Sequence, residues 1–148
     1  SMSDYHPFFV HFPIAILLVA AAFDLFAVLK QHEQSTSTAF YLQLMAGISA
    51  LFAAISGSFA EAAIQKQELL SLAVAETFGK HVSMANATVW IIMIVILGRS
   101  FAILEKKKWA TRGWVFPSIS LLLAALVLVT GLLGGELSQE ILRYFMQN

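Results

Sequence analysis

The chain has no cysteine and few charged residues, and both shortages narrow its chemistry. Without cysteine it forms no disulfide, no thiolate metal site, no iron–sulfur cluster of its own and no covalent c-type haem attachment. Only 12% of the 148 residues are charged, whereas about a quarter is usual in a soluble domain. The formal net charge of zero argues against a nucleic-acid partner. Hydrophobic residues make up 59% of the chain, which points to lipid as its solvent.

The hydrophobic residues gather in four long runs, at residues 8–29, 39–60, 82–104 and 115–133. Each run is close to the ~20 residues that a helix needs to cross ~30 Å of hydrocarbon. None has the alternating pattern of a membrane barrel strand. We therefore predict an all-α integral membrane protein, a single domain over residues 1–148 in which four antiparallel helices form an up-and-down bundle.

The link between the second and third runs is longer than the other connections. Within residues 61–80, apolar side chains such as Ile64, Leu69, Leu72 and Phe78 recur at loosely helical intervals. This pattern predicts an amphipathic helix lying at the membrane interface between spans two and three, or else an extension of the third span.

The basic residues predict an orientation. An even number of spans places both termini and the long link on one side of the membrane. That side carries Lys66, Lys80 and Arg143, whereas the two short loops are flanked by Lys30, Lys106, Lys107, Lys108 and Arg112. Because lysine and arginine accumulate on the cytoplasmic side, we expect the short loops inside and both termini outside. The amino terminus has no basic signal-peptide region, so we expect the first run to be retained as a span.

Histidines mark the candidate cofactor site. His6 and His11 open the first run, and His81 opens the third. The first and third spans run in the same direction, so these imidazoles are expected at similar depth near the outer surface. Facing helices of a bundle can place two imidazoles on either side of a haem iron. We take His11 and His81 as the expected axial pair, with His6 as the substitute ligand or a neighbour that orients it.

Other residues near the ends of the runs fit the same site. Glu136 ends the fourth run and is expected beside the histidines, as a proton acceptor or an orienting partner, or as an ordinary interfacial charge. Trp90 is a candidate to pack against a ring. Gly134 either serves close helix packing or lets a macrocycle approach the backbone, and packing is the commoner use.

Asp24 lies deep in the first run and is a costly residue to place in hydrocarbon. Its expected partner is Arg99 of the third run, at a comparable depth toward the inner face. A structural salt bridge between the two spans is the simpler interpretation, and a proton path is the alternative.

The segments HPFFVHFPIA, AAFDLF around Asp24, GKHVSMAN and TGLLGGEL together resemble a bacterial family of small four-span predicted membrane proteins of unknown function. Related domains occur with Rieske-type iron–sulfur proteins. The resemblance covers nearly the whole chain and implies a four-span fold and a redox setting. The expected location of the chain is a bacterial inner membrane. It draws attention to His6, His11, Asp24, His81 and Glu136.

Three functions remain open at this point. The first is a b-type haem protein for electron transfer, exchanging electrons with a quinone or a Rieske-type protein, with the haem near the extracytoplasmic face between spans one and three. The second is a zinc, copper or non-haem iron site made by His6, His11 and His81, with Glu136 offering a carboxylate. The third is a non-catalytic scaffold or subunit anchor. No nucleotide fingerprint or phosphate loop is present, so an electron carrier or redox subunit is expected rather than a stand-alone enzyme. The sequence leaves open whether the protein forms a homo-oligomer.

Overall fold

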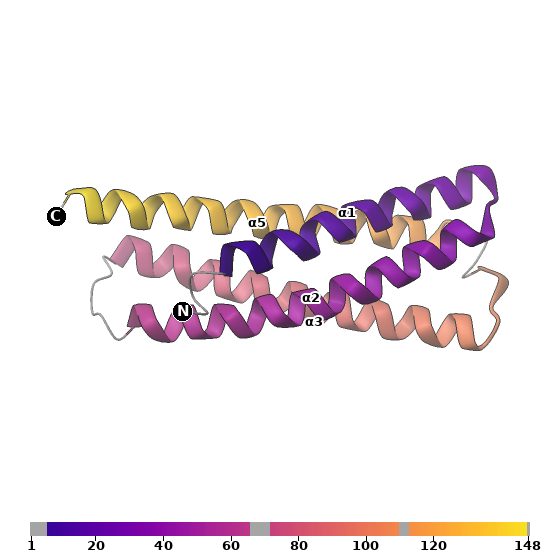
Figure 1. Cartoon of the computed structure of the whole chain (residues 1–148), viewed down its shortest axis with the longest axis horizontal. Coiled ribbons are helices and arrows are strands. Elements are labelled where there is room, and N and C mark those ends of the chain that lie inside the picture. The colour runs from indigo at the N-terminus through magenta and orange to yellow at the C-terminus, as the bar shows by residue number, and fades with distance from the viewer. Residues whose placement is uncertain (1–5, 66–71, 110–112, 148) are drawn as a thin grey trace.

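The computed structural model describes residues 6–65, 72–109 and 113–147, and these residues form a bundle of four long helices (Figure 1). The helices are α1 (His6–Lys30), α2 (Glu33–Gln65), α3 (Leu72–Leu104) and α5 (Val115–Gln147). Both α1 and α3 pack against α2 and against α5, so α1 and α3 face each other across the diagonal of the bundle. The predicted all-α up-and-down bundle is confirmed.

The two ends of the bundle differ in what they carry. The α1–α2 turn and the connection from α3 to α5 lie at one end, called here the loop end (Figure 1). The close of α2, the beginning of α3 and the close of α5 lie at the other end, called the terminal end, and α1 begins short of it.

The turn at the loop end is made by two residues, Gln31 and His32. Gln31 has a left-handed φ of 52°, a common way to end a helix. The His32 N–H donates to the Ala27 carbonyl at 3.0 Å, and the Ser35 N–H donates to Nδ1 of His32 at 3.3 Å. His32 therefore caps the first turn of α2 in the way that a side-chain acceptor caps a helix.

Large apolar side chains cover the outside of the bundle. Trp90, Leu122 and Leu132 are each 70% or more exposed, which a soluble monomer rarely tolerates over a whole surface. Four helices of the described chain are long and apolar enough to cross a membrane: Val10–Lys30, Glu33–Phe59, Glu76–Leu104 and Val115–Arg143. The chain is therefore a multi-pass membrane protein whose outer surface suits lipid.

The centre of the bundle is apolar and tightly packed. Its buried cluster takes residues from all four helices: Leu17, Ala46, Ala50, Ile92, Ile96, Leu123 and Val127. Gly47 of α2 lets α3 approach closely, since a Cβ added there would lie 2.5 Å from Cδ1 of Ile96. This apolar cluster separates the polar residues at the two ends.

The long link is built mainly by extending the spans. α2 continues to Gln65 and α3 already begins at Leu72, so of the two alternatives for residues 61–80 the structure shows the extension. A separate interfacial helix is therefore a wrong prediction for residues 72–80, because α3 is one continuous helix from Leu72 to Leu104. Residues 66–71 lie outside the described residues. At 33 residues, α2, α3 and α5 are each about 50 Å long and exceed the ~30 Å hydrocarbon thickness.

Candidate functional site

Four buried polar side chains, one from each helix, meet near the loop end. Asp24 of α1, Gln43 of α2, Arg99 of α3 and Ser120 of α5 are all at most 2% exposed. Arg99 Nη1 and Nη2 donate to the two carboxylate oxygens of Asp24 at 2.7 and 2.6 Å, a bidentate ion pair. Gln43 accepts from Arg99 at 2.9 Å and donates to the Ser120 hydroxyl at 2.6 Å, and that hydroxyl donates to Asp24. We call these four residues the buried polar cluster.

Arg99 has further contacts that hold its guanidinium in place. Its Nη2 donates to the backbone carbonyl of Thr36 at 3.2 Å. Its Cζ lies 4.8 Å from the ring centroid of Phe116 and 6.0 Å from that of Phe40, within cation–π range. Among the residues that the structure describes, Nε of Arg99 has no hydrogen-bond partner. The guanidinium of Arg99 is thus contacted on several sides, and only its Nε–H has no hydrogen-bond partner among the described residues.

The cluster ties all four helices together at one level. The Asp24–Arg99 ion pair expected from the sequence is present, and it joins the two diagonal helices. The contributions of Gln43 and Ser120 were missed. Gln43 gave a usable signal, since a glutamine inside a predicted span needs a partner. Ser120 gave none, because a serine in a membrane helix is equally common as a small packing residue.

His81 occupies a different position, on α3 toward the terminal end. It is half-buried, and its Nδ1 is buried without a hydrogen-bond partner in the described part of the chain. Its ring lies against Gly134 of α5, where an added Cβ would stand 2.9 Å from Cε1 of the imidazole. The absence of a side chain at Gly134 therefore makes room for the imidazole between α3 and α5.

The same part of α5 also contacts α1. A Cβ added at Gly131, three residues before Gly134, would lie 2.9 Å from Cδ1 of Ile14. Because three residues are less than one helical turn, α5 meets α1 and α3 at nearly the same depth. The first turns of α1 and the region of His81 therefore share the terminal half of the bundle.

The remaining sequence-predicted residues are more dispersed. His11 is an exposed residue of α1, Glu136 is exposed on α5, and Trp90 is 70% exposed on the outer surface of α3. His6 begins α1, and its side chain lies outside the described residues. The structure thus brings His81 into contact with Gly134, whereas the Trp90 side chain lies on the outer surface of the bundle.

Two kinds of chemistry are within reach of these groups. The buried polar cluster is a paired charge with few unused hydrogen-bonding groups, suited to fixing the helices. The His81 imidazole offers a buried nitrogen that can bind a metal or a haem iron. In the described part of the chain, no group of three or more histidine, aspartate or glutamate side chains is arranged to hold a metal ion.

Comparison with known proteins places the chain in one family. No curated protein and no solved structure matches it. A family model of predicted membrane proteins, DUF2231, matches residues 3–142, which is nearly the whole chain. The four apolar helices fit that description. The chain therefore belongs to the DUF2231 family of predicted membrane proteins.

Proposed function

We propose that the protein is a membrane-embedded b-type haem protein for electron transfer, with the haem near the terminal end between α1 and α3. The observation that carries this proposal is the His81 imidazole, whose buried Nδ1 has no partner among the described residues. A buried polar atom without a partner costs stability unless something else binds it. An imidazole nitrogen kept available in a largely apolar setting is what an axial iron ligand requires.

The helical register favours His6 over His11 as the second imidazole. The Asp24–Arg99 ion pair fixes how α1 and α3 face each other. His6 precedes Asp24 by eighteen residues, and His81 precedes Arg99 by eighteen. Eighteen residues are five full helical turns, roughly 27 Å along the axis.

On regular helices, His6 and His81 therefore take the same rotational positions as Asp24 and Arg99, which meet across the bundle. His11 is exposed on α1. We accordingly propose that His6 and His81 would hold the haem iron, with His11 near the surface of the site.

Haem, when bound, supplies reversible one-electron oxidation and reduction. The residues of the chain bind and orient it. His81 offers its nitrogen from α3, and Gly134 keeps the facing backbone clear of a side chain. Glu136 is exposed on α5 two residues further on, where a carboxylate can accept a proton from an imidazole or a bound quinone. A membrane quinone or a Rieske-type protein at the terminal end is the proposed redox partner.

The cofactor content of purified protein tests the proposal. Protein expressed with ample haem and purified in detergent is expected to contain stoichiometric haem b, measured as the pyridine haemochrome. Elemental analysis of the same sample separates the alternatives. Stoichiometric zinc, copper or iron without haem would replace this proposal with a non-haem metal site.

A scaffold or subunit anchor is the second candidate, and the buried polar cluster favours it. The cluster joins all four helices through hydrogen bonds among its own residues. A bundle fixed in this way needs no cofactor to hold its shape. Purified protein free of both haem and metal would support this function.

We also propose that the loop end faces the cytoplasm of a bacterial inner membrane and that both termini face outward. Five basic residues flank the short loops, against three at the terminal end. The cysteine-free chain allows a clean test with Lys107→Cys at the loop end and Met146→Cys near the carboxyl terminus, both exposed residues.

In intact spheroplasts, a membrane-impermeant maleimide is expected to label the Met146→Cys protein and to reach the Lys107→Cys protein only after lysis. The unmodified chain is the blank, since it carries no thiol. The reverse labelling pattern would invert the orientation.

A further inference from the structure

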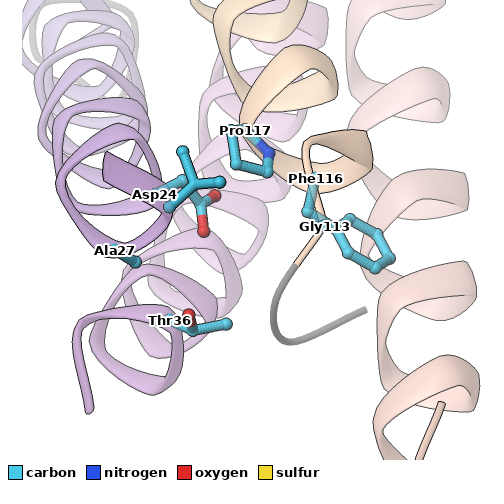
Figure 2. Close-up of a pocket in the computed structure, with 7 residues that line it drawn as sticks. Asp24, Ala27, Thr36, Gly113, Phe116 and Pro117 are labelled. Atoms are coloured by element: carbon cyan, nitrogen blue, oxygen red, sulfur yellow. The ribbon is translucent and has the colours of Figure 1, made fainter. Parts of the chain in front are cut away.

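A small pocket lies beside the buried polar cluster at the loop end. Its walls include Asp24 and Ala27 of α1, Thr36 of α2, and Gly113 and Phe116 before and within α5. Figure 2 shows Asp24 and Thr36 on one side of this space, with Phe116 and Gly113 opposite. The cavity volume is about 10 Å³, close to the smallest space that holds one water molecule.

The carboxylate in the pocket has hydrogen-bonding capacity left. Oδ2 of Asp24 accepts from Arg99, Ser120 and, at 3.5 Å, Gln43. Oδ1 accepts from Arg99 Nη2 alone among the hydrogen bonds of the described residues. A carboxylate oxygen has two lone pairs, so Oδ1 can accept one more hydrogen. A water in the pocket would supply it.

The pocket lies at the loop end, and apolar side chains border it on the side of the terminal end. Thr36 lies in the first turn of α2 and Gly113 lies in the connection that precedes α5, both at the loop end. Toward the terminal end, the nearest members of the apolar cluster along α3 and α5 are the buried side chains of Ile96 and Leu123, followed by Leu17 of α1. Those side chains offer no hydrogen bond to a water molecule.

We propose that this pocket binds one water molecule on Oδ1 of Asp24, that the water exchanges with the aqueous phase at the loop end, and that water access stops at this carboxylate. Asp24 and Arg99 are then a hydrated ion pair that water reaches from one side of the membrane only. The proposal is independent of the haem proposal, because it concerns the opposite end of the bundle.

Water-edited solid-state NMR of isotopically labelled protein in lipid vesicles tests this inference. Magnetisation that starts on water is expected to reach Thr36 and the Asp24 carboxyl carbon several times faster than it reaches Thr88 and Thr130. Thr88 and Thr130 are controls matched to Thr36 in burial, since Thr36 is 7% exposed, Thr88 5% and Thr130 9%. Thr88 and Thr130 share a hydrogen bond of 2.9 Å between α3 and α5.

A variant that fills the pocket gives the second measurement. Ala27→Val adds two methyl groups on the pocket wall and is expected to slow the transfer to Asp24 and Thr36. Ala20→Val, at a buried alanine of α1 that does not line the pocket, is expected to leave the transfer unchanged. Transfer to Thr36 and Asp24 in the unmodified protein as slow as that to Thr88 would overturn the proposal, and so would equal transfer in both variants.

Discussion

Arg99→Met is expected to destabilise the folded protein by about 3–5 kcal/mol, because it leaves the Asp24 carboxylate buried without its cation. Asp24 is 1% exposed and receives two hydrogen bonds from the guanidinium, which methionine cannot replace. Asp24→Asn is expected to cost a similar amount, since it leaves the guanidinium buried without its anion. Reversible unfolding in mixed detergent micelles measures both free energies.

The double variant separates a charge effect from a packing effect. With Asp24→Asn and Arg99→Met combined, no unpaired charge remains, and the new asparagine can still bond with Gln43 and Ser120 through its amide. Replacing a buried ion pair by neutral groups is often close to neutral. The double variant should therefore be clearly more stable than either single variant. A loss equal to the sum of the two single losses would contradict a charge-pair role.

The second large effect that we expect is loss of haem from the His81→Ala and His6→Ala proteins. The His11→Ala protein is expected to keep most of its haem. Each of these variants would remove one of the two protein ligands of the iron, and haem would bind more weakly. The reduced-minus-oxidised absorbance spectrum of solubilised membranes measures the Soret and α-bands at matched protein levels. His11→Ala is the matched control, because it removes an imidazole from the same helix at an exposed position.

Imidazole rescue distinguishes a ligand from a residue that merely supports the fold. In His81→Gly the side chain is gone from the space beside Gly134, and added free imidazole can enter and bind the iron. The haem bands should then return in the presence of imidazole, whereas a structural defect would not respond. Unchanged haem bands in both His6→Ala and His81→Ala would rule out this ligand assignment.

The sequence predicted the fold well because lipid leaves few choices. Four apolar runs of spanning length, joined by two short polar loops, permit little except an antiparallel bundle. Asp24 was paired with Arg99 for the same reason, since a charge in hydrocarbon needs an opposite charge at its own depth. The helix ends were predicted less well, because the segment of α3 before Val82 carries polar residues such as Glu76 and Lys80 although its backbone stays helical.

Which residues meet in the candidate site depends on the rotation of each helix about its own axis. The apolar runs of the sequence do not define that rotation. His11 is exposed on α1, and its spacing from the start of the run gave no sign of this. The contact between His81 and Gly134 needed the rotation of both α3 and α5. Once the Asp24–Arg99 contact is known, however, the eighteen-residue spacing to His6 and His81 can be read from the sequence alone.

The two polar regions belong to opposite ends of the molecule. The apolar cluster around Leu17, Ile92 and Val127 lies between them and offers no polar side chain of its own. Among the described residues, that cluster therefore offers no side-chain hydrogen bonds that would link the ion pair to His81. In the proposed function, the ion pair holds α1 and α3 in a fixed register relative to each other.

The low-temperature electron paramagnetic resonance spectrum of the purified, oxidised protein tests the central claim most directly. Two imidazoles, one from α1 and one from α3, bracketing a single iron predict the signal of a low-spin ferric haem with two nitrogen axial ligands. A high-spin ferric signal, which reports an iron with one axial protein ligand, would contradict the pairing of these two helices at the iron.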